Sequence, residues 1–444
     1  MKTSREELLE KALKPARDAM ILHPFYRGKI QTALKCPVRS VDDFAIWYTP
    51  GVAEPCKAIH ADPSLADLYT NRGNTIAVVS DGTRVLGLGD IGPAAALPVM
   101  EGKALLFKYL GGVDAVPICL DASDPDRFID CVRMLEPTFG GINLEDIAQP
   151  KCFRILDTLR EEMDIPVWHD DQQGTAAVNL AGLFNALEIV GKKIGSARIT
   201  LYGSGAANIA TARLLAAAGA EPGNLILIDS RGALHPGRRD LEGSNPEKWR
   251  MAQTTNAGQI TGGPEEAFRG ADVVFSYTKP GPDVIRPEWI SSMAKDAILF
   301  ACANPIPEIW PWDAKDAGAR IVATGRSDFP NQVNNSLGFP AIFRGTLDVR
   351  AKTITDGMCI AAAMELAECA RETGLSEERL IPTMDESWVY PRVAAAVGVK
   401  AIEEGVARES MSREYLIETA TRRIETAREM TAVLVERGII PLPE

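Results

Sequence analysis

Short apolar runs alternate with helical patterns along the first third of the chain. Two of these runs, at 75–80 and 84–89, flank an Asp81-Gly82 pair and predict strands joined by a turn. Upstream, the polar-apolar pattern at 4–20 predicts a helix. The downstream pattern predicts in turn a helix, a strand, two helices and an apolar strand, at 97–110, 115–120, 125–135, 149–162 and 165–169. Strands that alternate with helices in this way indicate an α/β layer structure.

The second half of the chain repeats the strand-helix rhythm more clearly. A helical pattern at 173–190 leads to the apolar run ARITLY at 197–202, which is followed by a glycine-rich turn and a helical pattern up to Gly219. Five apolar strands in this rhythm predict a doubly wound parallel sheet. Its strands are expected at 197–202, 225–229, 271–276, 297–303 and 320–325, and the remaining chain is mostly helical, ending in a long helix over 412–437.

This pattern divides the chain into two domains. We expect an N-terminal α/β catalytic domain over residues 1–168 and a Rossmann dinucleotide-binding domain over residues 169–444. The second domain would carry a helical C-terminal tail at about 335–444. Because the helices of this tail have apolar faces that need a partner, we expect them to pack back on the first domain.

Composition and charge narrow the class of protein. The 444 residues carry 48 Lys and Arg against 60 Asp and Glu, a net charge of −12, which disfavours nucleic acid as a partner. No apolar run approaches the roughly 20 residues of a membrane helix, so no membrane partner is expected. The N-terminus lacks the apolar core of a signal peptide, and the eight cysteines contain no CxxC pair. Together these features favour a cytoplasmic protein with reduced thiols.

A glycine turn over residues 203–208, with the sequence Gly-Ser-Gly-Ala-Ala-Asn, lies between a predicted strand and a predicted helix. Such a turn lets the backbone approach a pyrophosphate at the helix N-terminus. Asp229 follows Gly205 by 24 residues at the end of the next strand, where it can accept a hydrogen bond from a ribose hydroxyl. The candidate cofactor residues are therefore Gly203, Ser204, Gly205, Ala206, Ala207 and Asp229.

The choice between the two nicotinamide cofactors stays open at this point. Asp229 slightly favours NAD, because it would accept from the free 2′-hydroxyl. Arg231 lies two residues further on and could pair with the 2′-phosphate of NADP. Asn208 departs from the usual third Gly or Ala of the glycine turn, so the details of the pyrophosphate contact are not fixed by the pattern.

Two acidic pairs lie at predicted strand ends, Glu145-Asp146 and Asp170-Asp171. Converging carboxylates repel one another unless a cation lies between them, and ligands that are all oxygen suit Mg²⁺ or Mn²⁺. Adjacent strand residues point to opposite faces, so both members of a pair can share a ligand only where the backbone is irregular. On the residues alone, solvated loop acids or helix caps are an equally good interpretation.

The longer blocks around these residues resemble those of the malic enzymes, specifically the compact bacterial and archaeal type. The resemblance rests on several blocks and covers roughly residues 45 to 350 in the order of the family. The blocks are WYTPGVAEPC at 47–56, SDGTRVLGLGDIGPAAALPVMEGKALLFK at 80–108, FGGINLEDI at 139–147, PVWHDDQQGTA at 166–176, ANPIPEI at 303–309 and ATGRSDFPNQVNNSLGFPAIFRG at 323–345. The run Ala94-Ala95-Ala96 is plainer than the family pattern.

The resemblance implies a role for each matched residue. Tyr48 and Lys103 match the catalytic tyrosine and lysine, and Asp170 matches the acid that pairs with the lysine. The three metal ligands would be Glu145, Asp146 and Asp171. Arg84 matches an arginine that holds a substrate carboxylate, whereas two asparagines would line the substrate and nicotinamide pocket and a threonine would contact the cofactor, namely Asn304, Asn335 and Thr175.

The function implied by the resemblance is the oxidative decarboxylation of L-malate to pyruvate and CO₂, with NAD or NADP as oxidant and Mg²⁺ or Mn²⁺ as the metal. A homodimer or larger homo-oligomer is implied as well. Two alternatives are kept: a decarboxylase or dehydrogenase of another 2-hydroxy or 2-oxo diacid, and a non-catalytic NAD(H)-binding redox sensor. A sensor would need the glycine turn but not Tyr48, Lys103 and the carboxylates, which argues against it.

Overall fold

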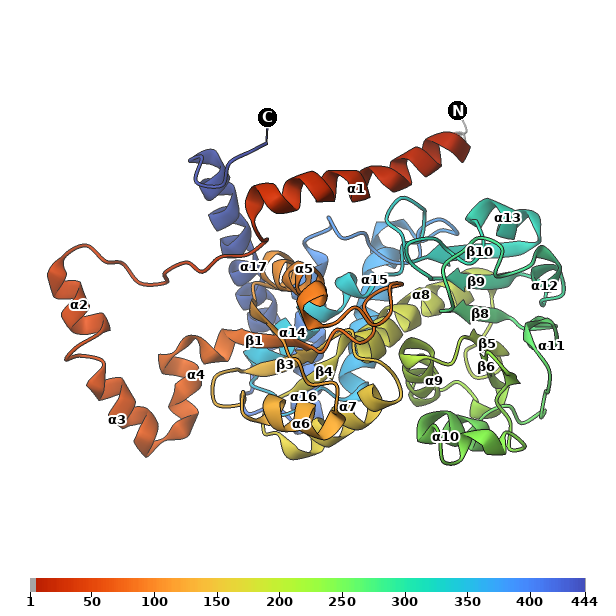
Figure 1. The fold of residues 1–444 in the computed structure, drawn as a ribbon, viewed down its shortest axis with the longest axis horizontal. Helices are drawn as coiled ribbons and strands as arrows, with labels where there is room; N and C mark the ends of the chain where they lie inside the picture. The colour runs from red at the N-terminus through yellow and green to blue at the C-terminus, as the bar shows by residue number, and fades with distance from the viewer. Residues whose placement is uncertain (1–4, 444) are drawn as a thin grey trace.

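The structure is a computed structural model that describes residues 5–443. Before the first strand the chain forms a series of helices, α1 (Arg5–Tyr26), α2 (Val41–Trp47), α3 (Ala53–Ala61) and α4 (Ala66–Tyr69), with short 3₁₀ turns at Pro63–Leu65 and Asn71–Asn74. We call residues 27–62, which include α2 and α3, the arm. In Figure 1 the arm extends away from the rest of the molecule.

The N-terminal domain is built on a four-stranded parallel sheet in the order β2-β1-β3-β4. Its strands are β1 (Thr75–Ser80), β2 (Asp114–Cys119), β3 (Gly141–Leu144) and β4 (Val167–His169), and its helices are α5 (Pro93–Gly111), α6 (Pro125–Arg133) and α7 (Lys151–Glu162). Strands β1, β3 and β4 are almost entirely buried, as expected for a parallel sheet covered on both faces. Because the strands are parallel, their carboxyl ends meet at one edge of the sheet.

The predicted strand at 84–89 is wrong. Residues 84–89 form a loop in which only an isolated bridge joins Val85 to Gly89, and Leu86 has a φ of 47°. The reason is that β1 already pairs with β2 on one side and β3 on the other, so neither edge of β1 is open to a hairpin partner that follows it in sequence. The loop instead anchors on the site, because the Arg84 backbone N–H donates to the carbonyl oxygen of Asp146 at 3.0 Å.

The second domain has a six-stranded sheet in the order β10-β9-β8-β5-β6-β7, all parallel except the short edge strand β7. The strands are β5 (Ile199–Tyr202), β6 (Leu225–Asp229), β7 (Gly232–Ala233), β8 (Val273–Ser276), β9 (Ala297–Ala301) and β10 (Ala319–Thr324). The helices of this domain are α8 (Thr175–Val190), α9 (Ala206–Ala217), α10 (Pro246–Thr254), α11 (Pro264–Phe268), α12 (Pro287–Ser291) and α13 (Pro311–Asp316). This confirms the predicted doubly wound Rossmann sheet.

The C-terminal helices α14 (Phe339–Asp348), α15 (Asp356–Gly374), α16 (Val389–Glu403) and α17 (Arg413–Glu436) return to the N-terminal domain. Helices α14 and α17 contact α5 of that domain. The Phe107 ring on α5 lies 4.6 Å from the ring of Phe339 and 5.3 Å from that of Phe343, both on α14. These aromatic contacts make one hydrophobic core out of residues that are more than 200 positions apart.

Candidate active site

Three carboxylates converge at the carboxyl edge of the first sheet. Glu145 and Asp146 follow β3 directly, and Asp171 is the second residue after the end of β4. One oxygen from each of the three lies within 4.8 Å of the others, and we call these residues the acidic cluster. The backbone is irregular here, as the sharing of a ligand requires, because Asp146 has a left-handed φ of 55° and its N–H donates to Asp171 Oδ2 at 2.8 Å.

The acidic cluster fits a hard divalent cation. Glu145 is 2% exposed and Asp146 is 4% exposed, and the buried Oδ2 of Asp146 has no hydrogen-bond partner among the described residues. Burial and then the charge of Asp171 raise the pKa of Asp146 to about 8, and burial likewise raises the pKa of Glu145. Carboxylates in this state are stabilised by a cation, and a set of oxygen donors alone selects Mg²⁺ or Mn²⁺.

Lys103 reaches the acidic cluster from α5. Its Nζ contacts Asp170 Oδ2 and lies 3.0 Å from Glu145 Oε1, and it sits 4.6 Å above the ring of Phe339. Burial lowers the pKa of Lys103, but the charges of Asp170, Glu145 and Asp171 raise it by more. The protein groups alone therefore keep Lys103 protonated, and cationic charge in the acidic cluster would be needed to release its proton.

Asp170 is held in place by the turn that follows it. Residues Asp170–Gly174 form a single π-helical turn that leads into α8. A β-carbon at Gly174 would lie only 1.8 Å from Asp170 Oδ1, so any larger residue here would displace the Asp170 side chain. The Asn335 side chain lies 3.5 Å from the same point, which brings this predicted pocket residue next to Asp170. Thr175, the first residue of α8, follows directly.

Arg84 and Asn304 lie at the border between the two domains. The Arg84 side chain is exposed and donates to the carbonyl oxygen of Leu86 at 2.6 Å. Its positive charge nevertheless opposes part of the rise in the pKa of Asp146. A β-carbon at Gly87 would lie 2.9 Å from the carbonyl oxygen of Asn304, so the loop at 84–89 touches the segment that follows β9. Substrate held by the acidic cluster would therefore lie near both segments.

Tyr48 is the one predicted catalytic residue that the structure does not bring to the acidic cluster. It caps the end of α2 on the arm and is 71% exposed. Within residues 5–443 no hydrogen bond joins its hydroxyl to another group. Figure 1 shows the arm on the outside of the molecule, away from α5 and β3, which carry or precede Lys103 and the acidic cluster.

The glycine turn lies where the order of strands reverses. Strand β5 pairs with β6 on one side and β8 on the other, and such a switch point opens a crevice for a ligand. Gly203 has a φ of 92°, and a β-carbon there would lie 2.3 Å from the carbonyl oxygen of Tyr277. A β-carbon at Gly205 would meet nothing, and the buried Ser204 Oγ has no partner within the described part of the chain. These features fit a phosphate at the N-terminus of α9.

Comparison with known proteins gives the decisive match. The chain matches the model of the malic enzyme N-terminal domain over residues 27–160 and the model of the malic enzyme NAD binding domain over residues 172–274 and 286–404. The chain belongs to the malic enzyme family. This membership confirms the resemblance that the sequence blocks indicated.

Individual malic enzymes match almost end to end. The chain is 49% identical to the bifunctional malic/malolactic enzyme of Bacillus subtilis over 92% of its own length and 98% of that protein. It is 44% identical to the NADP-dependent malic enzyme of Halomonas elongata, over 88% of its length and 94% of that protein. The crystal structure of the Entamoeba histolytica malic enzyme superposes with a TM-score of 0.96 at 48% identity, covering 100% of this chain and 93% of that one.

Asn208 explains how this malic enzyme forms its glycine turn without a third glycine. Its buried Nδ2 donates to the carbonyl oxygens of Tyr202 at 3.0 Å, Gly203 at 2.8 Å and Phe275 at 3.3 Å. The amide therefore ties the turn to the ends of both β5 and β8. The departure from the glycine pattern is therefore a structural brace.

Asp229 lies at the end of β6 as predicted, but its carboxylate already has basic partners. Arg238 donates to both of its oxygens at 3.0 Å, and Lys248 Nζ lies 3.3 Å from Oδ2. Arg231 gives Asp229 only its backbone N–H, because its guanidinium is 72% exposed and pairs with Asp240 at 3.1 Å. The sequence interpretation therefore missed the two basic side chains that contact Asp229.

Two further buried residues support the malic enzyme site, although the sequence pattern did not single them out. Asn143 on β3 donates to Glu145 Oε2 at 3.0 Å, which orients one member of the acidic cluster. Glu308 accepts hydrogen bonds from the backbone N–H groups of Thr278 at 2.9 Å and Ala303 at 3.0 Å, so it joins the segments after β8 and β9 beside Asn304. Their position inside the matched blocks is the one clue that the sequence offered.

Proposed function

We propose that this chain catalyses the oxidative decarboxylation of L-malate to pyruvate and CO₂, with NAD⁺ or NADP⁺ as oxidant and Mg²⁺ or Mn²⁺ as the metal. The carrying observation is that Lys103 contacts both Asp170 and a member of the acidic cluster. The names of the relatives, which include an NADP-dependent malic enzyme, support this choice of substrate and cofactors. A redox sensor would have no use for the buried lysine and carboxylates.

The acidic cluster would hold the metal through Glu145, Asp146 and Asp171. A divalent cation bound there would polarise the oxygen on C2 and stabilise the negative charge of the enolate left by CO₂. Arg84, Asn304 and Asn335 would bind and orient the substrate. The cofactor would lie along the glycine turn through Gly203, Ser204, Gly205, Ala206 and Ala207, with contacts to Thr175, Asp229, Asn304 and Asn335.

Lys103 would act as the general base. It takes the proton of the 2-hydroxyl while the hydride on C2 passes to the nicotinamide, which leaves oxaloacetate. Asp170 can accept this proton from Lys103, because the two side chains are in contact and burial raises the pKa of Asp170. The C3–C4 bond then breaks and CO₂ leaves. The electron pair of the broken bond forms the enolate of pyruvate. Protonation of C3 completes the reaction.

We propose that Tyr48 supplies this last proton to the site of a second copy of the chain. Its exposure on the arm, together with large exposed apolar side chains such as Leu34 (80% exposed) and Val41 (81% exposed), supports a role at a surface between copies. A homodimer in which each arm reaches its neighbour would place one tyrosine at each site.

Mixing two inactive variants tests this arrangement. Tyr48→Phe and Lys103→Ala chains are unfolded together, refolded and assayed for malate-dependent reduction of the cofactor. An arm that serves its neighbour restores one intact site per mixed dimer, which gives about a quarter of wild-type activity after random pairing. If each tyrosine serves its own chain, every site stays defective and the mixture stays inactive.

Initial-rate assays test the reaction itself. Malate, Mn²⁺ and either cofactor should give equal amounts of pyruvate and reduced cofactor, and EDTA should abolish both. Lys103→Ala should lower turnover by about 10³-fold while cofactor binding survives. The matched control is Lys108→Ala on the same helix, because Lys108 pairs with Asp114 at 2.7 Å. Lactate without net reduction of the cofactor would indicate malolactic chemistry instead, and no malate-dependent product would overturn the proposal.

The division of the chain and its location also stay proposals. We place the domain boundary at 168/169, immediately before the turn that carries Asp170 and Asp171, with the helices at 335–444 as a tail that packs on the first domain. A reducing cytoplasm is proposed from the eight free cysteines. Among the described residues no helix combines the length and apolar character needed to span a bilayer.

A further inference from the structure

A cavity lies beside the π-helical turn at Asp170–Gly174, which supplies Gln172 and Gln173 to its lining. Its volume is about 320 Å³, and it is formed where α7 of the first domain meets α9 and α10 of the Rossmann domain and the start of α15. This volume suits a small metabolite. We call it the interdomain cavity, and its charged and polar lining residues are Asp157, Arg160, Gln172, Gln173, Arg213, Arg250 and Asp356.

Two buried hydrogen-bond donors in this lining have no acceptor. Gln173 is 8% exposed, and its Nε2 lacks a partner among the described residues. The Nε of Arg213, whose side chain is 25% exposed, likewise lacks a partner. A buried donor without an acceptor costs free energy, so two of them in one cavity indicate that an acceptor belongs there.

Three arginines line the interdomain cavity and supply its positive charge: Arg160, Arg213 and Arg250. Arg213 and Arg250 share Glu247, and Arg160 donates to the carbonyl oxygen of Ile354 at 2.7 Å. Burial and then the charge of Arg250 lower the pKa of Arg213, and the charges of Asp157 and Asp356 offset only part of this shift. The remaining acids, Asp157 and Asp356, are exposed and lie at the solvent side.

We infer that the interdomain cavity binds a small metabolite through a phosphate or carboxylate group, held by Arg213, Arg250 and the amide of Gln173. This goes beyond the proposed function, because malate and the cofactor are assigned elsewhere. Planar guanidinium groups and amide N–H donors are the groups that recognise oxyanions in proteins.

The anion would act on the metal site through Gln173. The Oε1 of this side chain accepts the backbone N–H of His169 at 3.1 Å, and Gln173 is only two residues from Asp171. An oxyanion on Nε2 would therefore fix both ends of one amide and hold the turn at 170–174 more firmly. Since the cavity joins elements of both domains, its occupation would also favour one relative placement of the two.

Binding is measured by calorimetry on the full chain in EDTA, without malate or cofactor, so the outcome does not depend on the proposed reaction. The probes are inorganic phosphate, 3-phosphoglycerate and succinate, which separate a free phosphate, a phosphorylated acid and a dicarboxylate. We expect at least one to bind at a single site. If none binds, the inference is wrong.

Variants locate the bound anion. Arg250→Gln, at the exposed rim, should weaken binding about tenfold, and Arg213→Gln should weaken it further. Gln173→Glu keeps the acceptor for His169 but replaces the donor with a negative charge, so it should abolish binding. The control is Arg269→Gln, an arginine that is 66% exposed and lies outside the cavity. Equal affinity in all four variants would place the anion elsewhere and refute the inference.

Hydrogen exchange tests the link to the metal site. The best-binding probe should slow exchange of the backbone amides at 169–175 in the wild-type chain at least about threefold, and leave them unchanged in Gln173→Glu. Binding that is lost in the cavity variants but never slows exchange at 169–175 would overturn the proposed action on the turn.

Discussion

Asp146 shows how much of the site depends on one backbone conformation. A strand would point Glu145 and Asp146 to opposite faces, but the left-handed φ of 55° at Asp146 lets both carboxylates join Asp171. The strain of a left-handed aspartate is tolerated because its N–H and its carbonyl oxygen are both bonded, to Asp171 Oδ2 and to the Arg84 N–H.

Metal binding should depend on pH through Asp146. Its pKa of about 8 means that a proton competes with the cation below that pH. We expect Mn²⁺ affinity to rise about tenfold per pH unit from pH 6 to 8, as measured by calorimetry. The raised pKa also means that the folded, metal-free chain binds this proton more tightly than the unfolded chain. Its thermal stability in EDTA should therefore fall as pH rises toward 8.

The Asp146→Asn variant is the control for this prediction. It should flatten the pH dependence of metal-free stability and bind Mn²⁺ weakly at every pH. A Mn²⁺ affinity of the wild-type chain that stays constant between pH 6 and 8 would contradict the assignment of the raised pKa.

Gly174 should be required for turnover although it has no functional group. Gly174→Ala places a β-carbon against Asp170 Oδ1, so Asp170 must leave Lys103. We expect turnover to fall about 10²-fold, as for other displacements of about 1 Å at a reacting centre. Gly243→Ala, where a β-carbon meets nothing, should leave the rate unchanged. Equal rates in both variants would show that Asp170 is not needed beside Lys103.

At the scale of elements, buried strands were predictable and loops were not. Strands β1, β5, β6 and β9 coincide with apolar runs because a parallel sheet buries both faces of each strand. The run at 84–89 has a similar composition, but both edges of the preceding strand β1 are already paired. The pairing of Lys103 with Asp170 depends on contacts between α5 and the residues after β4, and the resemblance alone indicated it.

Side-chain partners across elements were beyond the sequence pattern. Asn208 braces the glycine turn through a carbonyl on β8, 67 positions away. Arg238 and Lys248 reach Asp229 from the chain after β7, whereas the nearer Arg231 turns out to solvent. Closeness in sequence therefore did not predict which arginine side chain contacts Asp229.

Lys248, on α10, should influence the choice of cofactor. Its Nζ beside Asp229 would lie near a 2′-phosphate, so Lys248→Ala should raise the KM for NADP⁺ about tenfold and change the KM for NAD⁺ little. Initial rates with each cofactor measure this difference. Arg231→Ala is the comparison, since its guanidinium pairs with Asp240, and it should change both values by less than about twofold. A rise in the KM for NADP⁺ in Arg231→Ala but not in Lys248→Ala would instead assign recognition of the 2′-phosphate to Arg231.

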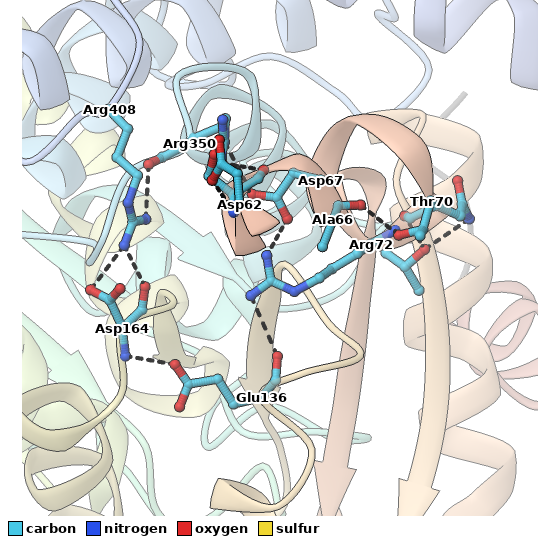
Figure 2. A network of polar contacts seen from close by, with 12 residues as sticks. Asp62, Ala66, Asp67, Thr70, Arg72, Glu136, Asp164, Arg350 and Arg408 are labelled. Carbon is cyan, nitrogen blue, oxygen red and sulfur yellow. Dashed lines mark hydrogen bonds and ion pairs between the residues drawn. The ribbon is translucent and has the colours of Figure 1, made fainter. Parts of the chain in front are cut away.

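At the scale of the whole molecule, a network of ion pairs and hydrogen bonds joins the base of the arm to the first domain and to the C-terminal helices. Asp67 on α4 contacts Arg72 and lies 2.8 Å from Arg350, which follows α14. Figure 2 shows the network continuing from Arg72 to Glu136 and from Arg350 to Arg408 and Asp164, and the Asp164 N–H joins the two branches by donating to Glu136 Oε1 at 3.0 Å. Helix α4 at the base of the arm, the first domain and the C-terminal helices are thus joined at one place.

Removing Asp67 should loosen this fastening. Its side chain is 16% exposed, so Asp67→Asn leaves two partly buried guanidinium groups without their carboxylate. We expect a loss of about 2 kcal/mol in the free energy of unfolding, measured with urea. Glu409→Gln removes a 46% exposed partner of Arg350 and should cost less than about 0.5 kcal/mol. Equal losses in the free energy of unfolding would mean that Asp67 stabilises the chain no more than an exposed ion-pair partner does.

The exposed arm carries a consequence for how the rate responds to dilution. If Tyr48 completes the site of a neighbouring copy, a lone chain can bind its ligands but cannot finish the reaction. Rate per milligram should then decline on dilution below the dissociation constant of the pair, and recover with second-order kinetics when the chains are concentrated again. A lone chain that still oxidises and decarboxylates malate would release the enol of pyruvate and leave the protonation of C3 to solvent, so dilution would alter the immediate product as well as the rate.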